Sequence, residues 1–554
     1  MEALDIAAEV THEDCRLALQ NIELLRNATL EGSGLDDETI ARLRDPPHGP
    51  SNELNDPDTL MSIELFLATI NASEKTYERA VKSFVRRCPH VKPLSFYKDA
   101  NGCEQVKRAI ERITGVVGLK HDMCVNSCIG FTGARATLDA CPKCGQARYC
   151  PIAAKAGKVV SRQQFTTMPL GPQAQTIYQT PDGAESMRYL FDAASQILRD
   201  LPPGHPLKVY SDLPSGAKLL ELIHTGVITE NDIVVMFSIN GAQLYKCKDS
   251  DCWMSLWIVA SLGPDKRYKK QYVLPGVIIP GPKHLKDLDS FIFPGLYHVS
   301  ALMRNGLGIW DALCNTSYVS KIYLLMWLAD SPASALLQGT VGYHGARGCR
   351  LYCPLPGRHK MGCPHYLPAL LKPFNYTVSG CDHGDISQAS IGAPSSEEYS
   401  RNLELLLSAK NETQYKKIRK ATGICKPSLF SGLSRALPMP FGAPLDLMHL
   451  ACLNVTDLLI SIWRGVVKGS TQSDPKSWPC AVLQEKAVWE AHGLRVHRAT
   501  PYLPGFFDHP PRNIALRLTS GYKAHQEKPP RRMRAIKHPV VLMMYNLAYI
   551  ALEV

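Results

Sequence analysis

Two short cysteine pairs constrain the fold of this chain more than any other feature. The sequence reads Cys-Val-Asn-Ser-Cys at 124–128 and Cys-Pro-Lys-Cys at 141–144. Four thiolates at this spacing can close a tetrahedral site around one Zn²⁺ and hold a loop-rich segment together. Thiolates are soft ligands, so zinc is the expected occupant and an iron–sulfur cluster the weaker alternative. We predict a structural zinc site at Cys124, Cys128, Cys141 and Cys144, since four protein ligands leave no open position for catalysis.

A second group of cysteines and histidines lies at 344–383, where proline and glycine interrupt the chain. These interruptions favour an insertion over a part of a sheet. A workable structural zinc set is Cys349, Cys353, Cys363 and His365, with His359, Cys381 and His383 as substitutes. Spacing leaves two alternatives open here, a zinc site and a set of free thiols.

The composition indicates a soluble intracellular protein with no membrane partner. The chain starts Met-Glu-Ala-Leu-Asp, which is acidic where a secretory signal is basic, and its 18 cysteines are spread over 554 residues. No apolar run reaches the roughly 18 residues of a membrane span. The net charge of +11 permits a polyanionic partner without demanding one.

The apolar patterns predict a mixed α/β (α+β) fold. The run at 233–239 is almost unbroken and β-branched, which is typical of a buried strand. Further strands are expected at 255–260 and 272–279, and helices at 288–305, 319–328 and 445–463. Strands that are followed by helices favour a mixed core over separate all-α or all-β domains.

Three polar residues stand where such elements begin or end. Asn240 follows the strand at 233–239, Asp289 starts the helix at 288–305, and Asp446 starts the helix at 445–463. Carboxylates at such positions can hold the Mg²⁺ ions of phosphoryl transfer, which lie about 3.5–4 Å apart. The structural alternatives are a turn residue for Asn240 and helix N-caps for Asp289 and Asp446. Spacing alone does not decide between these interpretations.

Two basic runs, at 266–270 and 528–534, could contact phosphates or serve as a nuclear import signal. Runs this short are more often solvated surface.

Longer strings resemble the fungal CACTA (En/Spm-type) transposases. The resemblance is carried by Ser95–Tyr97, Asp122–Gly133, Cys141–Gly145, Met236–Tyr245, Asp265–Lys270, Gly345–Cys353 and Asp446–His449. It covers residues 35 to 523. It implies an RNase H-like core whose acidic ligands bind Mg²⁺ or Mn²⁺, and which cuts transposon ends and joins them to target DNA. It also implies a nuclear protein with DNA as partner and a homo-oligomer as a candidate assembly.

The resemblance assigns roles to the polar residues singled out above. Asn240 stands where the family usually has its first catalytic aspartate, and Asp289 matches the second. Asp446 is the candidate for the third acidic ligand, with Asp457 as the fallback. The region with Cys349, Cys353, Cys363 and His365 is similar to the family's Cys/His insertion. We thus expect catalytic roles for Asn240, Asp289 and Asp446.

Two departures from the family bear on activity. Asn240 removes one negative charge from a site for two dications, so metal affinity and activity should fall steeply. After 521–524 the likeness stops, so residues 525–554 are expected to be a divergent, truncated end.

The expected organisation follows from these patterns. We predict a helical region (1–95), a zinc-ribbon-like module with four cysteines (96–160), a linker (161–230), the core in two parts (231–343 and 386–524) around an insertion (344–385), and the divergent end (525–554). The leading function is a transposase-derived protein with impaired DNA cleavage and strand transfer. The alternatives are a zinc-containing DNA-binding or assembly protein without catalysis, and a structural zinc protein with no nucleic-acid role.

Overall fold

The computed structural model describes residues 10–49, 51–69, 72–93, 105–201, 205–243, 251–281, 285–360, 362–446, 454–467, 474–502 and 513–517. They divide into two units, one ending at Pro444 and one beginning at Leu445. The strands are β1 Leu119–Asp122, β2 Gln164–Thr167, β3 Ile233–Gln243, β4 Asp251–Val259, β5 Val273–Pro280, β6 Leu307–Asp311, β7 Thr316–Ser320, β8 Ile322–Leu328, β9 Gly357–His359 and β10 Tyr366–Pro368.

The helices of the first unit are α2 Glu13–Arg26, α3 Asp37–Arg44, α4 Pro57–Ala68, α5 Glu74–Arg87, α6 Gln105–Thr114, α7 Pro151–Lys155, α8 Leu170–Tyr178, α9 Pro181–Ser186, α10 Tyr189–Asp200, α11 Ala217–His224, α12 Pro264–Arg267, α13 Asp289–Asn305, α14 Ser331–Gln338, α15 Ser396–Leu407 and α16 Glu412–Thr422. Those of the second unit are α17 Thr456–Trp463, α18 Lys486–Arg498 and α19 Ile514–Arg517. This content confirms the mixed α+β prediction.

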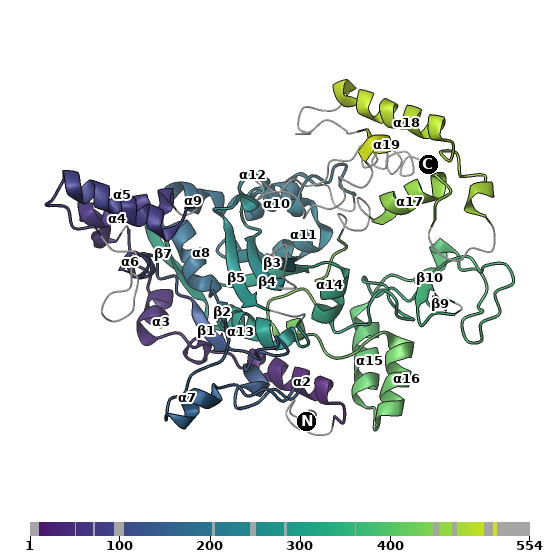
Figure 1. Cartoon of the computed structure of the whole chain (residues 1–554), viewed down its shortest axis with the longest axis horizontal. Helices are drawn as coiled ribbons and strands as arrows, with labels where there is room; N and C mark the ends of the chain where they lie inside the picture. Colours follow the sequence, from purple (N-terminus) through teal and green to yellow (C-terminus); the bar gives the residue numbers. More distant parts are fainter. Residues whose placement is uncertain are drawn as a thin grey trace. The chain divides into compact units, whose positions relative to one another are not determined.

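A mixed sheet forms the centre of the first unit (Figure 1), with the strand order β1-β2-β5-β4-β3-β8. Neighbouring strands run antiparallel except β3 and β8, which are parallel. The free edge of β8 is accompanied by a later segment, since Leu324 N donates to Arg435 O at 2.9 Å and Trp327 N to Gly442 O at 2.8 Å. The bridge between Leu324 and Ala436 is parallel, so this segment runs in the direction of β8.

Helices cover both faces of the sheet, as the alternation of side chains along β3 shows. The odd-numbered residues from Ile233 to Ile239 belong to the larger apolar core, together with side chains of α2, α3, α8 and α13. Val234 and Met236 belong to a second core with side chains of α10 and α11. Successive side chains of a strand point to opposite faces, so the sheet is the middle of three layers.

Two of the N-terminal helices, α2 and α3, are part of the larger core, whereas α4 and α5 pack with α6 in a small apolar cluster of their own. Leu25 and Leu43, on α2 and α3, are fully buried in the larger apolar core. Ser300 of α13 donates a hydrogen bond to Leu25 O at 2.7 Å. Helix α2 therefore packs directly on α13.

One sequence-based assignment is wrong. Residues 319–328 were expected to be a helix, but residues 322–328 form β8 and residues 316–320 form β7. A seven-residue apolar run cannot be assigned by periodicity, because a strand buried on both faces shows no alternation. The flanking β-branched and aromatic residues favour the strand.

The second unit has a small apolar core of its own, built from Ile460, Leu483, Trp489 and Ile514. The helix predicted at 445–463 is observed as α17 from Thr456, while residues 447–453 lie outside the described residues.

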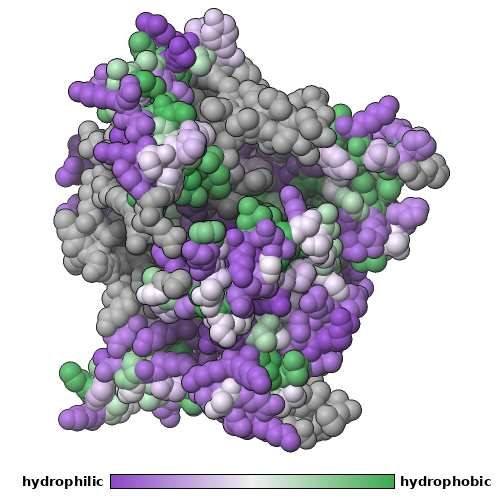
Figure 2. Space-filling view, turned by 90° about the vertical axis from the view of Figure 1, so that its right-hand side faces the viewer, coloured by the Kyte–Doolittle hydropathy of each residue, from purple (hydrophilic) through white to green (hydrophobic). Residues whose placement is uncertain are grey.

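None of the described helices combines the length and the apolar character needed to cross a membrane. On the face of the molecule shown in Figure 2, hydrophilic residues predominate and hydrophobic ones are scattered between them. Single exposed apolar residues are ordinary on a protein surface.

Candidate functional site

The four cysteines predicted from spacing come together. The sulfur atoms of Cys124, Cys128, Cys141 and Cys144 all lie within 4.8 Å of one another, and three of the four side chains are buried. The Sγ atoms of Cys124 and Cys144 are 3.4 Å apart. A tetrahedral Zn²⁺ with Zn–S bonds of about 2.3 Å places its sulfurs about 3.8 Å apart. The donor type and the spacing therefore fit zinc.

Two tight turns present these cysteines. In the first, Cys124 N donates to Ile129 O at 3.0 Å and Ser127 N to Cys124 O at 2.8 Å. In the second, Cys141 N donates to Gln146 O at 2.9 Å, and Gly145 closes the turn with a φ of +72°. That φ favours glycine, because it lacks a Cβ. Each turn brings its two sulfurs to the same side of the four-cysteine module.

The thiols disfavour joint ionisation without a cation. Burial, and after it the neighbouring thiols, raise the pKa of Cys128 to about 12. The pKa of Cys141 is raised to about 11, also chiefly by burial. A bound dication removes this cost, because it favours the thiolate over the thiol.

The four-cysteine module is attached to the start of α13 and to α2. Asp287 N donates to Cys128 O at 3.0 Å, and Gly130 N donates to Ser290 Oγ at 2.9 Å. The buried Arg135 guanidinium lies 3.2 Å from Asp287, and Ala134 N donates to Asn21 Oδ1 at 2.9 Å. Loss of the metal should therefore be felt in the main core as well as in the module.

The second predicted zinc set is not assembled. Within the residues that the structure describes, only Cys124, Cys128, Cys141 and Cys144 form a metal-sized cluster. Burial and, after it, the neighbouring Cys349 thiol raise the pKa of Cys353 to about 11. Cys363 and His365 do not join them, and the His365 ring stacks on His344 instead, with centroids 4.0 Å apart.

An arginine organises this insertion. The side chain of Arg358, which is 3% exposed, donates to the carbonyl oxygens of Ala369, Leu370, Cys381, His383 and Gly384. A guanidinium has five N–H donors in a fixed plane, so one residue can hold several backbone segments. Sequence reasoning missed Arg358 because the spacing of this region drew attention to its metal ligands.

Asn240 lies inside a strand and not in a turn. β3 continues to Gln243, and Asn240 is paired with Met254 of β4. Its side chain is exposed. By alternation from Val234 and Met236, Asn240 is on the face of the sheet that α10 and α11 cover.

Asp289 lies on the opposite side of the sheet. It is the first residue of α13, a helix of the larger core, and its carboxylate pairs with the Lys426 ammonium. Burial raises the pKa of Asp289, and Lys426 opposes this shift. The helix N-cap is Leu288, so Asp289 is not the capping residue either. The structure does not bring Asp289 to Asn240, because α13 packs on the odd-numbered face of β3.

A carboxylate that sequence reasoning missed, Asp330, comes shortly after β8, the parallel neighbour of β3. The parallel register of β3 and β8 ends with Ser238 opposite Leu328. Asn240 and Asp330 each follow two residues later, and their neighbouring strands lie about 4.8 Å apart. Asp330 is half-buried, and its Oδ1 accepts from Ala333 N at 2.9 Å at the start of α14. The signal was present in the sequence, since an aspartate follows an apolar run there.

The remaining acidic candidates are in the second unit. Asp446 is half-buried, and Asp457 is exposed in the first turn of α17. Their proposed roles as metal ligands rest on the resemblance alone and stay predictions.

Two of the four basic residues in the run at 266–270 form ion pairs within the protein. Arg267 is fully buried, and its guanidinium binds Asp212 with N–O distances of 2.8 and 3.0 Å. Lys266 Nζ lies 2.8 Å from Asp182. Lys269 and Lys270 are exposed and remain available to a polyanion. The run at 528–534 lies outside the described residues.

Replacing Arg267 with alanine is expected to destabilise the first unit by about 3 kcal/mol or more, because it removes one partner of a buried ion pair. Lys270→Ala should change stability by less than about 0.5 kcal/mol. Arg267 also holds the pKa of Asp212 below its usual value, against the effect of burial. The contribution of that carboxylate is present above its unfolded pKa and is lost as pH falls through the folded one. Thermal unfolding of both variants at neutral and acid pH measures this, and equal midpoints at neutral pH would contradict the assignment.

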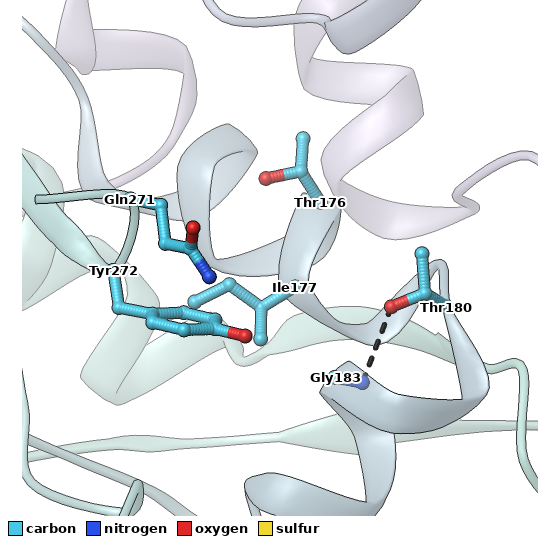
Figure 3. A pocket seen from close by; sticks show the side chains of 6 residues that line it. All are labelled: Thr176, Ile177, Thr180, Gly183, Gln271 and Tyr272. Atoms are coloured by element: carbon cyan, nitrogen blue, oxygen red, sulfur yellow. Dashed lines mark hydrogen bonds between the residues drawn. The ribbon is translucent and has the colours of Figure 1, made fainter. Parts of the chain in front are cut away.

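A small cavity of about 210 Å³ lies beside this run (Figure 3), lined by Thr176, Ile177, Thr180, Gly183, Gln271 and Tyr272. Thr180 Oγ1 accepts a hydrogen bond from Gly183 N at 3.2 Å. Ligand sites usually measure about 300–1,000 Å³, so we assign this cavity no ligand.

Comparison with known proteins gives one family match. Residues 238–358 match the model of transposase family tnp2, which supports a transposase family for the chain. The match begins two residues before Asn240 and ends in β9, so it includes Asp289, Asp330 and the Cys349–Cys353 segment. It does not include the four-cysteine module or Asp446. No curated protein matches the chain.

Proposed function

We propose that the chain is a transposase-derived protein of the CACTA type, with an RNase H-like core around β3 and β8. The family match over 238–358 carries this proposal, because it includes both Asn240 and Asp330, and β3 and β8 are parallel neighbours. A transposase family implies DNA as a partner.

The topology of the sheet supports the RNase H-like part. The strands β3, β4 and β5 form an antiparallel series, and the chain then passes through α13 and the β6–β7 hairpin to β8, which is parallel to β3. The segment at 435–442 follows the outer edge of β8 in the same direction. A mixed sheet of this order is expected of an RNase H-like core.

In the first unit, the proposed centre consists of Asn240 and Asp330, and the role of Asp446 as an acidic ligand stays a prediction from the resemblance alone. Mg²⁺ or Mn²⁺ bound there would activate a water for phosphodiester hydrolysis and a 3′-hydroxyl for strand transfer. Asp330 supplies a carboxylate from the start of α14, and its hydrogen bond from Ala333 N fixes the orientation of that side chain. Asp289 is left out because it pairs with Lys426 on the other side of the sheet.

Asn240 makes this an impaired centre. The amide oxygen of asparagine carries no net charge. A carboxylate about 4 Å from a unit positive charge gains about 4 kcal/mol of Coulomb attraction at an effective dielectric constant of about 20. The loss of that interaction weakens the binding of a dication. The second candidate function is therefore a DNA-binding or assembly protein that retains the fold without the chemistry.

Restoring the carboxylate tests the enzymatic proposal. We expect Asn240→Asp to raise Mg²⁺-dependent nicking of duplex DNA bearing terminal repeats at least about tenfold, which corresponds to about 1.4 kcal/mol. The double variant Asn240→Asp/Asp330→Asn should return to the wild-type rate. Asn240→Asp/Asp265→Asn is the matched control, because Asp265 is exposed in the first turn of α12, and it should keep the gain.

The other outcomes separate the alternatives. DNA binding without cleavage by either form would favour the assembly protein. Cleavage that survives Asp330→Asn would exclude Asp330 from the centre. A lack of salt-sensitive DNA affinity would remove both functions.

A further inference from the structure

We propose that Arg350 is a phosphate-binding residue, which holds a DNA phosphodiester beside Asp330. The inference rests on the proposed function and names a residue of the insertion that contacts the substrate. Arg350 lies between Cys349 and Cys353, in the part of the insertion that the family match includes.

The Arg350 side chain connects the insertion to the start of α14. Arg350 Nε donates to Ser331 Oγ at 2.9 Å, and Ser331 is the residue that follows Asp330. The guanidinium is thereby placed at the N-terminal end of α14, which the Asp330 carboxylate caps. A positive side chain is therefore bound to the residue that follows Asp330.

The backbone that carries Arg350 is anchored. Tyr352 N donates to Cys349 O at 3.1 Å and closes a turn around Arg350. The Tyr352 side chain is buried, accepts a hydrogen bond from Asn402 at 2.9 Å and packs edge-on against Tyr399 of α15. A half-buried arginine on such a turn has little freedom to move away from Ser331.

The charge of Arg350 is not neutralised by the protein. No carboxylate in the described part of the chain forms an ion pair with it, whereas the buried Arg135 and Arg267 pair with Asp287 and Asp212. Among the described residues, the guanidinium bonds through Nε to Ser331, and its terminal N–H groups have no acceptor there. Two terminal nitrogens in one plane match the oxygens of a phosphate.

The structural alternative is that Arg350 only ties the insertion to α14. The two roles differ in their dependence on charge. A phosphate contact releases about 0.9 of a counterion, so its loss lowers the slope of log Kd against log salt by about that amount. A structural tie would affect thermal stability and leave the slope unchanged.

The test measures the affinity of the full chain for a short mixed-sequence duplex at several salt concentrations. We expect Arg350→Ala to reduce the slope of log Kd against log salt by about 0.9. Arg350→Lys keeps the charge and should retain most of the wild-type slope. Ser331→Ala should keep the slope, because it removes the tie and retains the charge. Arg16→Ala on α2 is the matched control, since that arginine is exposed and distant in sequence, and it should bind as the wild type does.

The midpoint of thermal unfolding is measured for each variant used in these titrations. If Arg350→Ala lowers the midpoint, Arg350→Gln replaces it, since the amide can still donate to Ser331 without a charge. A wild-type slope in the uncharged variants overturns the inference and leaves the proposed DNA binding intact. Absence of salt-dependent binding by the wild-type chain overturns both.

Discussion

Cys128→Ser is expected to lower the free energy of unfolding of the first unit by about 4 kcal/mol or more, a range that single substitutions reach when a bound metal is lost. Cys128 is 1% exposed, and its sulfur lies within 4.8 Å of three other thiols. A serine hydroxyl is a poor zinc ligand, so the remaining cysteines would be left crowded and without a cation.

The loss of stability in Cys128→Ser should extend beyond the four-cysteine module. Cys128 O accepts a hydrogen bond from Asp287 N, and Gly130 N is bound to Ser290 Oγ, so the metal-bearing turn supports the first residues of α13. That helix supplies Leu296 and Val299 to the larger core, where both are fully buried. Disorder of the turn would remove contacts from the helix that covers one face of the sheet.

Cys150→Ser provides the control for this prediction. Cys150 lies six residues after Cys144, at the N-cap of α7, and is not a member of the cluster. Serine serves well at an N-cap, so this variant should unfold as the wild type does. Elemental analysis should find one zinc equivalent fewer in Cys128→Ser than in Cys150→Ser. Equal zinc contents and equal midpoints would contradict the site.

Lys426→Met is expected to destabilise the first unit by about 3–5 kcal/mol, since it leaves a buried carboxylate without its cation. Side-chain exposure is 19% for Lys426 and 7% for Asp289, so little solvent reaches the pair. Lys426 N also donates to Gly339 O at 3.1 Å, at the end of α14. The pair thus links the first turn of α13 to the segment that leaves α14.

The loss of stability caused by Lys426→Met should depend on pH. Burial raises the pKa of Asp289 above its ordinary value. Below this raised pKa the carboxyl is neutral and its burial costs less, so the deficit of Lys426→Met should shrink as pH falls through it. Above the raised pKa the full cost of the unpaired carboxylate remains.

Two further variants complete this experiment. Asp289→Leu/Lys426→Met should recover most of the lost stability, because neither charge remains buried. Lys417→Met, at an exposed position of α16, should change stability by less than about 0.5 kcal/mol. If Lys426→Met were neutral and Mg²⁺ raised the midpoint of the wild type but not of Asp289→Asn, Asp289 would be the metal ligand that the resemblance implies.

The local pattern of apolar residues was sufficient to predict a strand and a helix of the core. The strand at 233–239 and the helix at 288–305 are found as β3 and α13, close to their expected bounds. Both are apolar segments with well-marked ends, so local preference and tertiary packing agree there. The run at 319–328 instead crosses the boundary between β7 and β8, and its assignment as a helix concealed Asp330 just after a strand.

The residues of the predicted Cys/His set are not brought together, for a different reason. Cysteine and histidine are ligands in some contexts and packing residues in others, and the spacing between 349 and 365 is the same in both cases. In the structure the His365 ring stacks on His344, and Arg358 holds the surrounding loop. The sequence contains Arg358 but does not show which carbonyl groups surround it.

The sequence alone determined the four-cysteine cluster, because its ligands are close in the chain and each pair needs only one tight turn to bring its sulfurs together. It also determined the apolar strand that carries Asn240. Only the tertiary structure decided which acidic residue lies near Asn240, since that depends on strand order, register and face. Asp289 and Asp330 are equally plausible in the linear chain, but α13 packs on the odd-numbered face of β3, whereas β8 lies beside β3 in parallel register.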